Sequence, residues 1–564
     1  MTSPRSGAGR DPAPLGAGRG TNGLRLAAVE RAASWVANLT GAGRALFAAL
    51  AGALSVLAFA PVHAWPVLFL TFGALVWLLD GCHARHASIG PRLKSAALVG
   101  FWFGFGYFLA GLYWIAEAFL VEPWRHGWLI PFVMTAMPGG MAPFFAAAAA
   151  LAMALWLPGA GRVFALAIAL GLAEYARGHV LTGLPWNLIG YGLLATLPLM
   201  QPAALLGVYA LSLLAVLLFA SPAALFAPRG SRLGGGLGSA ALVGLLVTSL
   251  GLGYVWGERR LASAAPDSTG VRLRIVQANV DQAEKWRPEN SVEIFNDYLE
   301  LTEAGGLENI DIVIWPETAV PFLLADAPDA LSAIGDALPQ GTSLLVGSGR
   351  LVEESDAPGE PIADRIYNSL LVVDDQGGVI GSYDKIHLVP FGEYLPFQSF
   401  LESLGIMQLT GVRGGFAVGK GPRLLAVPGA PPASPLICYE IIFPDEVTDR
   451  AARPGWFINI TNDAWFGSSA GPYQHFHQAQ VRAIEQGLPV ARAANTGISA
   501  VIDPYGRILA EIGLGERGAI DAYLPKVGPQ TPFVQFGTIL EISVLVLALA
   551  GWLACRVHSF RPHR

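Results

Sequence analysis

One cysteine of the chain lies where an acyl-transfer nucleophile would be placed. Residues 434–437 form a short apolar run with the character of a strand, and this run ends at Cys438. Phe443 and Pro444 then begin a stretch with the character of a helix. A thiol at such a turn lies near backbone N–H groups that can stabilise an oxyanion. A buried structural cysteine is the other interpretation, and it is the commoner one for a cysteine considered alone.

Two further residues with useful functional groups also follow predicted strands. Glu317 comes directly after residues 310–315, in the sequence Trp-Pro-Glu-Thr. Lys385 has Tyr, Ile, Leu, Val and Phe residues around it, and Glu393 follows it after a turn marked by proline and glycine. Catalytic groups in α/β proteins collect at the carboxyl ends of strands. Considered singly, a glutamate such as Glu317 is more often a solvated loop residue, and Lys385 is readily explained as a surface lysine with a buried stem.

Together these residue types could carry out acyl transfer. A free thiol has a pKa of about 8.5, so it needs a base or a nearby cation to react as a thiolate. A carboxylate can take the thiol proton, return it to a leaving alcohol and then accept one from an incoming amine. An ammonium group, together with the backbone N–H of Tyr439, can stabilise the tetrahedral oxyanion.

The composition divides the chain into a membrane part and a water-facing part. Of the 564 residues, 53% are hydrophobic and 14% are charged, whereas soluble domains have about 25% charged residues. Residues 45–256 contain few acids, while 257–530 have the composition of a soluble domain. The net charge of −6 and the lack of a basic stripe argue against nucleic acid as a partner. Three cysteines make no disulfide framework.

A metal site is not expected. His475 and His477 are two positions apart, and His387 lies beside Lys385. A metal site needs at least one further ligand at a suitable spacing, and the sequence offers none near the His475–His477 pair or near His387. We therefore predict neither a metal nor another cofactor.

Apolar segments predict eight membrane-spanning helices. Two short spans fall within residues 45–79, with a turn at Pro61 and His63 between them. The other six are expected at 95–116, 127–161, 163–179, 203–226, 233–256 and 534–554. The predicted organisation is a disordered basic arm (1–42), a seven-helix transmembrane domain (43–260), a catalytic domain (271–530), a C-terminal transmembrane helix (533–555) and a cytoplasmic tail (556–564).

Positive charges between the spans predict the orientation of the chain. Alternate loops contain basic residues on the same side as the N-terminal arm and the C-terminal tail: Arg85, Arg92 and Lys94, then Arg162, then Arg229 and Arg232. The positive-inside rule places that side in the cytoplasm. With seven spans before it and one after it, the catalytic domain then lies outside.

Two features allow two interpretations each. Glu174 and Arg177 can pair on one face of a helix, either for a function within the membrane or to order the loop that follows. An apolar stripe of helical spacing follows Glu393, and it suits either a core or a membrane-facing arm that admits acyl chains. The stripe consists of Phe397, Phe400, Leu401 and Leu404.

Residues 271–530 alternate short runs of strand character with helical stretches, which predicts an α/β layered domain. Strands are expected at 271–280, 310–315, 343–347, 369–373, 424–427, 435–438, 456–460, 490–493 and 500–502. Helices are expected between them at 293–303, 327–337 and 475–485.

Three motifs in a fixed order give the chain a family resemblance. They are Trp-Pro-Glu, Asp-Lys-x6-Gly-Glu-Tyr-Leu-Pro-Phe and Cys-Tyr-Glu, each at a predicted strand end. With them the chain resembles the nitrilase (carbon-nitrogen hydrolase) superfamily. With the membrane spans as well, it is similar to the apolipoprotein N-acyltransferases, the integral-membrane family of that superfamily, over about residues 45–555. The resemblance implies a polytopic α-helical membrane domain and a nitrilase-like α-β-β-α sandwich.

The resemblance also implies roles for individual residues. Glu317 is the general base, Lys385 stabilises the oxyanion and Cys438 is the nucleophile. The accessory residues are Trp286, Glu393, Tyr439, Glu440 and Trp465. A purely structural role is the alternative for these accessory residues: packing for the aromatic side chains, and solvation at the surface for Glu440.

The implied reaction transfers an acyl chain from a membrane phospholipid to a cysteine thioester. The chain then passes to the α-amine of a diacylglyceryl-modified N-terminal cysteine of an apolipoprotein. The implied setting is a monomer in the bacterial inner membrane, with its catalytic domain in the periplasm and both termini in the cytoplasm. The alternatives are a membrane-tethered amidase or nitrilase, and a transporter or receptor whose α/β domain only binds a ligand.

Overall fold

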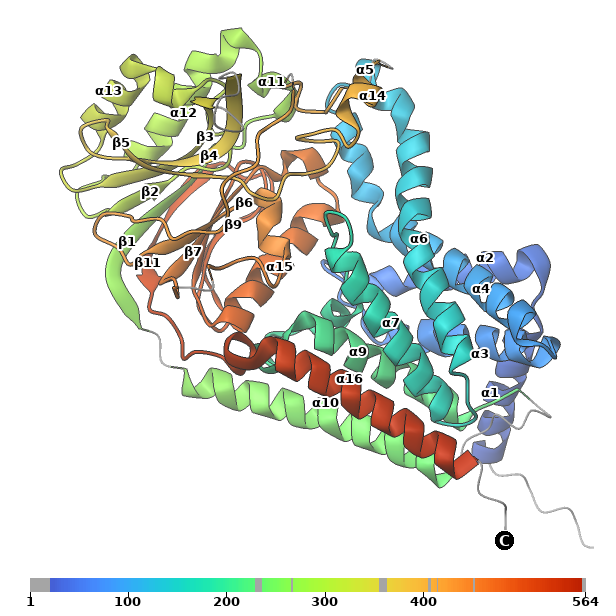
Figure 1. Cartoon of the computed structure of the whole chain (residues 1–564). Helices are drawn as coiled ribbons and strands as arrows, with labels where there is room; N and C mark the ends of the chain where they lie inside the picture. The colour runs from blue at the N-terminus through green and yellow to red at the C-terminus, as the bar shows by residue number, and fades with distance from the viewer. Residues whose placement is uncertain are drawn as a thin grey trace, which may run out of the picture.

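The computed structural model describes residues 21–228, 236–264, 267–354, 363–403, 407–412, 414–449 and 452–559. A bundle of helices occupies one end of the molecule and an α/β part the other (Figure 1). Parts of the predicted N-terminal arm, of the basic loop with Arg229 and Arg232, and of the C-terminal tail lie outside the described residues.

The prediction of a disordered arm over residues 1–42 was wrong for its second half. Helix α1 (Thr21–Asn38) packs on α3 (Val67–Arg85), and α2 already begins at Gly41. Ala33, Val36 and Ala37 are buried and repeat at helical spacing, so they give α1 one apolar face. The many glycines and arginines that precede α1 in the sequence concealed that face.

Most of the predicted spans are confirmed as long apolar helices. Within the described residues, seven helices are long and apolar enough to cross a membrane. They comprise α2 with its 3-10 extension, α3, α4, α5–α6, α9, α10 and α16. The helix bounds are α2 (Gly41–Ser55), α4 (Ile89–Gly111), α5 (Pro123–His126), α6 (Ile130–Ala154), α7 (Gly161–His179), α8 (Leu197–Met200), α9 (Ala203–Leu225), α10 (Leu237–Ser263) and α16 (Pro532–Ser559).

Helix α7 coincides with the remaining predicted span but is more polar. It carries three buried charged side chains, Arg162, Glu174 and Arg177. Arg162 pairs with Asp80 of α3, and Arg177 pairs with Glu174 at 2.9 Å. The helix packs against α6, α9 and α16 inside the bundle. Its charges are therefore neutralised within the protein.

Glycines allow the first membrane helices to approach closely. A Cβ atom on Gly52 of α2, or on Gly100 or Gly106 of α4, would collide with the backbone of a neighbouring helix. Such small residues are the usual basis of helix packing in membranes, where lipid tails are as apolar as the helix surfaces.

The α/β part contains two sheets that pack face to face. One has the order β11-β1-β2-β3-β4-β5 and the other β10-β9-β8-β7-β6. Strands β1–β3 are mutually parallel, as are β6–β8. The bounds are β1 (Ser268–Gln277), β2 (Ile312–Ile314), β3 (Ser343–Glu354), β4 (Ala363–Val373), β5 (Val379–Asp384), β6 (Ala433–Ile437), β7 (Trp456–Thr461), β8 (Val490–Ala494), β9 (Ser499–Ile502), β10 (Ile508–Ile512) and β11 (Gly518–Pro525).

Helices cover the outer faces and complete the α-β-β-α layers. Helices α12 (Ser291–Glu303) and α13 (Pro328–Ala337) cover the larger sheet, and α15 (Ala470–Gln486) packs beside the smaller one. Side chains alternate between the two cores: Ile312 and Ile314 of β2 belong to the core between the sheets, and Val313 to the core under the helices.

Some strands differ from the predictions. Residues 424–427 make only one isolated bridge, between Leu425 and Ala433, and not a strand. Strands β5, β10 and β11 were not predicted. Their outer residues are partly exposed, so they lack the continuous apolar run that marks a buried strand.

Helix α15 joins the α/β part to the membrane bundle. Four of its polar side chains are buried and bond to the segment between α7 and the first two turns of α9. Gln474 accepts from Trp186 at 2.7 Å, His477 bonds to the Leu194 carbonyl at 2.9 Å, Arg482 donates to the Tyr191 hydroxyl at 2.9 Å, and Glu485 accepts from the Val208 N–H at 2.9 Å. The apolar core between the sheets is continuous with that of the bundle.

Candidate active site

Three strands of the sandwich deliver Glu317, Lys385 and Cys438 to one edge of the two sheets. Glu317 follows β2, Lys385 follows β5 and Cys438 follows β6. All three side chains are buried. The Lys385 ammonium lies 3.3 Å from Oε1 of Glu317. Both charged groups also lie close enough to the Cys438 thiol to change its pKa.

Glu393 anchors the lysine from the loop that follows. Its Oε1 lies 2.9 Å from the Lys385 ammonium, and its Oε2 accepts from the Val389 N–H at 2.8 Å. Burial alone would lower the pKa of Lys385, but the attraction of Glu393 and Glu317 outweighs burial and raises it. Lys385 is therefore an ammonium at neutral pH.

Asn368, which the sequence did not single out, connects the two glutamates. Its amide Nδ2 donates to Glu317 at 2.7 Å and to Glu393 at 2.9 Å. The backbone carbonyl of Asn368 also accepts from the backbone N–H of Lys385 at 2.9 Å. Asn368 lies on β4, where a buried amide beside an apolar run was the available signal.

Cys438 occupies a strained turn. Its φ is +53°, in the left-handed region that side chains rarely adopt. Such outliers persist only where the surroundings hold them, and they collect at functional sites. Burial and the nearby Glu317 raise the pKa of the Cys438 thiol, and Lys385 opposes them only in part. The resting residue is therefore a thiol, which needs a base when it reacts.

Lys285 is a second buried lysine that the sequence analysis overlooked. It ends α11 (Gln282–Lys285), and its ammonium lies 3.4 Å from the Thr318 hydroxyl. Burial lowers its pKa to about 8, although Glu317 attracts the charged form. The neighbouring Trp286, a predicted accessory residue, is 53% exposed.

Glu440 holds the lysine loop against the cysteine turn. It is 3% exposed, so the interpretation as a solvated surface residue was wrong. Its carboxylate accepts from the N–H groups of Ile386 (2.7 Å), His387 (3.1 Å) and Ile437 (2.7 Å). Burial raises its pKa to about 7.

A loop of the membrane part contacts this assembly. Within residues 180–189, the Gly183 carbonyl accepts from the Tyr439 hydroxyl at 3.0 Å. The Thr182 carbonyl bonds to Nε2 of His387 at 2.7 Å. Arg177 holds the loop by donating to the carbonyls of Leu184 and Trp186, and Glu174 accepts from the Ile189 N–H. The pair thus orders the loop, which was one of its two interpretations.

The remaining predicted residues lie around the edge. Trp465 is half-buried in the 3-10 helix Asp463–Phe466, after β7. Among the described residues, no hydrogen bond joins Trp286 or Trp465 to Glu317, Lys385 or Cys438. In the apolar stripe, Phe397 is 86% exposed and Phe400 63%, beside and within α14 (Gln398–Ser403), so they are not core residues. Leu404 lies outside the described residues.

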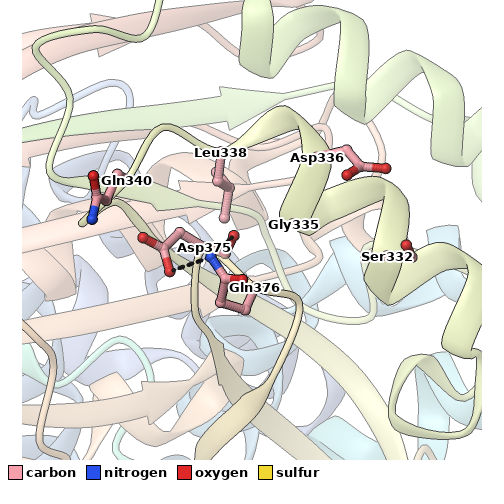
Figure 2. A pocket seen from close by; sticks show the side chains of 7 residues that line it. All are labelled: Ser332, Gly335, Asp336, Leu338, Gln340, Asp375 and Gln376. Carbon is pink, nitrogen blue, oxygen red and sulfur yellow. Dashed lines mark hydrogen bonds between the residues drawn. The ribbon is translucent and has the colours of Figure 1, made fainter.

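A polar hollow elsewhere on the α/β part contains none of the predicted site residues. It lies between α13 and the turn after β4, as Figure 2 shows. Its lining consists of Ser332, Gly335, Asp336, Leu338, Gln340, Asp375 and Gln376.

The histidines considered as ligands have other partners. His475 bonds to Asp463 and to the Cys438 carbonyl, whereas His477 bonds to the Leu194 carbonyl. In the described part of the chain, no group of three or more His, Cys, Asp or Glu residues could hold a metal ion.

Two family models match the sequence. The apolipoprotein N-acyltransferase N-terminal domain matches residues 51–221, and the carbon-nitrogen hydrolase family matches residues 272–528. Among curated relatives, an apolipoprotein N-acyltransferase of Rhodopseudomonas palustris is 45% identical over 93% of this chain and 97% of its own length. Proteins of the same name from Bradyrhizobium diazoefficiens and Brucella suis are 47% and 43% identical, over 92% and 94% of this chain and 96% and 99% of their own lengths.

Proposed function

Since the chain belongs to the apolipoprotein N-acyltransferase family, we propose that it N-acylates apolipoproteins through a thioester on Cys438. The donor is a membrane phospholipid, and the acceptor is the α-amine of an N-terminal diacylglyceryl-cysteine. The observation that carries the proposal is the junction of Glu317, Lys385 and the Cys438 thiol at one buried sheet edge, beside a loop of the membrane bundle.

In the first half-reaction, sulfur attacks the ester carbonyl carbon while Glu317 takes the thiol proton. The resulting oxyanion is stabilised by the Lys385 ammonium and the Tyr439 N–H, and each donor of this kind contributes about 3–4 kcal/mol. The C–O bond then breaks. Glu317 returns the proton to the leaving alkoxide, and a lysophospholipid departs.

In the second half-reaction, the amine of the acceptor attacks the thioester. Glu317 takes a proton from that amine, the same two donors hold the oxyanion, and the C–S bond breaks. Glu317 then returns the proton to the thiolate, which restores the resting thiol. The turn at Cys438, whose φ is positive, presents the sulfur to both substrates.

The site needs protection from water while the thioester waits for its second substrate. The exposed aromatic side chains of Phe397 and Phe400 lie on the chain shortly after Glu393. We place them in the lipid or against bound acyl chains, where they help to exclude water. The protein acts as a monomer in the bacterial inner membrane, with the α/β part in the periplasm and both termini in the cytoplasm.

The test follows the acyl group. The full-length enzyme is incubated with labelled phospholipid, and the peptide that contains Cys438 is examined by mass spectrometry. We expect an acyl adduct that Cys438→Ala abolishes. The label should pass to the N-terminus of a diacylglyceryl lipopeptide when one is added. If free fatty acid appears without an acceptor as fast as amide forms with it, the enzyme is a hydrolase and the transferase proposal fails.

A further inference from the structure

The peptide group between Cys438 and Tyr439 makes a contact that the proposed mechanism does not use. Its carbonyl oxygen, on Cys438, lies 3.1 Å from Nε2 of His475. Its N–H, on Tyr439, is the proposed backbone donor to the oxyanion. His475 is fully buried on α15 and thus bonds to the opposite end of the same peptide group.

Asp463 orients the His475 ring from the other side. Its Oδ1 lies 2.9 Å from Nδ1 of His475, and its Oδ2 accepts from Arg492 at 2.7 Å. Arg492 also lies 3.2 Å from Nδ1. Because a carbonyl oxygen can only accept, Nε2 must carry a proton, whether Nδ1 donates to Asp463 or accepts from Arg492.

We propose that His475, oriented by Asp463, is a positioning residue that strengthens the Tyr439 N–H as an oxyanion donor. A hydrogen bond to the carbonyl draws electron density towards oxygen and makes the amide N–H of the same peptide a stronger donor. Linked hydrogen bonds of this kind reinforce one another in a low-dielectric interior. The same bond holds Cys438 at its unfavourable φ. The inference rests on the proposed function.

Two substitutions separate the two bonds of the ring. The amide of Gln can reach the place of Nε2, so His475→Gln keeps a donor to the Cys438 carbonyl. The shorter Asn reaches only the place of Nδ1, so His475→Asn keeps the Asp463 bond and loses the carbonyl bond. His477→Asn is the matched control, because it removes the same type of bond from the same helix but at the Leu194 carbonyl.

Single-turnover acylation by labelled phospholipid gives the kinetic result. We expect His475→Asn to lower the acylation rate by at least about tenfold, less than the 10²–10³ seen when an oxyanion donor is removed outright. The KM for phospholipid should stay within about twofold, since His475 does not touch the substrate. His475→Gln and the His477→Asn control should retain the rate within about threefold. Equal rates for His475→Gln and His475→Asn, in folded proteins, would overturn the proposal.

A spectroscopic measurement is independent of substrate. Cys438 is the one cysteine that a tyrosine follows. Labelling with carbonyl-13C cysteine and 15N tyrosine therefore gives a single coupled peptide signal in the NMR spectrum of the full chain. We expect the downfield carbonyl shift of a hydrogen-bonded group in the unmutated enzyme and in His475→Gln, and an upfield move in His475→Asn. The shift of an unbonded carbonyl in the unmutated enzyme overturns the inference even if the variants do not fold. It leaves the acyl-transfer proposal standing.

Discussion

Lys285 gives the site a second cation. Glu317 and Glu393 carry two negative charges at the sheet edge, and Lys385 alone would balance only one of them. The Lys285 ammonium lies 3.4 Å from the hydroxyl of Thr318, the residue after Glu317. It attracts the Glu317 carboxylate electrostatically. The four charges therefore sum to zero in a region that water hardly reaches, and this arrangement limits the cost of burying them.

The lowered pKa of Lys285 predicts a pH-dependent stability. An unfolded chain holds this proton up to about pH 10.5, whereas the folded protein loses it near pH 8. The unfolded state thus binds more protons between these values, so the contribution of Lys285 to stability rises with pH there. We expect the melting temperature of Lys285→Met, relative to wild type, to be lower at pH 10 than at pH 8. A difference that is constant over this range would contradict the prediction.

Glu440 tests whether the loop of Lys385 needs a carboxylate. In Glu440→Gln an NH2 group would face backbone N–H donors in place of an acceptor. Leaving buried polar groups unsatisfied costs about 1–3 kcal/mol each. We therefore expect a melting temperature lower by several degrees and a kcat at least about tenfold lower. Glu446→Gln is the control, because Glu446 bonds to His387 of the same loop from a half-exposed position. Its kcat should stay close to that of wild type.

Local sequence patterns predicted the site residues that follow strands, and they missed the residues whose role depends on tertiary contacts. Glu317, Lys385 and Cys438 each follow a strand, and a strand end is visible in a local pattern. Asn368 lies within a strand, where the only local signal was an amide beside an apolar run, and Lys285 lies beside an exposed tryptophan and had no local signal of its role. Their importance arises from tertiary contacts with residues that are distant in the sequence: 33 positions separate Lys285 from Thr318, and 25 and 51 positions separate Asn368 from Glu393 and Glu317.

At the scale of elements, the loop 180–189 links the membrane bundle to the proposed catalytic residues. Arg177 and Glu174 of α7 hydrogen-bond to the backbone of this loop, and the loop's own carbonyl groups hydrogen-bond to Tyr439 and His387 of the α/β part. Tyr439 directly follows Cys438, and His387 lies two residues after Lys385. The helix α7 therefore influences the site without contributing a residue to it.

The prediction for this element uses a conservative exchange. Arg177→Lys keeps a charge beside Glu174 but loses the planar fork that holds the carbonyls of Leu184 and Trp186. We expect kcat to fall by about tenfold, since misplacement of a catalytic group by a small distance has a large effect on rate. Arg162→Lys is matched to it: that residue is also buried on α7 and paired with an acid, but it bonds to Ala223 and Phe226 instead. A similar loss of kcat in both variants would show that only the stability of α7 matters.

The secondary structure was predicted best where burial was continuous. The parallel strands β2, β6, β7 and β8 are buried on both faces, and β1 is buried over its second half. All five read as mainly apolar runs, which arginines interrupt in β1 and β8. Partly exposed strands such as β5 and β10 have no such run and were missed. Helix α1 was missed because its buried residues, Ala33, Val36 and Ala37, are few and mostly small, and because a stretch rich in glycine and arginine precedes the helix.

At the scale of the whole molecule, α7 decides on which side of the membrane the catalytic domain lies. If α7 crosses, seven spans precede the α/β part and place it opposite the N-terminus. If it does not, six spans precede it and place both on one side. Figure 1 shows α1 and the C-terminal end of α16 at one end of the bundle and the α/β part at the other. This arrangement supports the crossing of α7.

Reporter fusions test the orientation. Fusions after Trp256 and before Phe533 should report the periplasm, and fusions at both termini the cytoplasm, as the basic loops predict. An enzyme that is active only in the periplasm and one that is active only in the cytoplasm should be fused at each point. A cytoplasmic signal from either internal fusion would contradict the crossing of α7 and the proposed location of the site.

The buried polar face of α15 limits the exchange of either half of the chain between related proteins. Arg482 and Glu485 are fully buried, and their partners, the Tyr191 hydroxyl and the Val208 N–H, belong to the other half of the chain. Arg482 and Glu485 pair with each other at 2.6 Å, and an excised α/β half would expose this pair within an uncovered apolar surface. Neither half can therefore be exchanged for that of a distant relative unless both sides of the seam are exchanged with it.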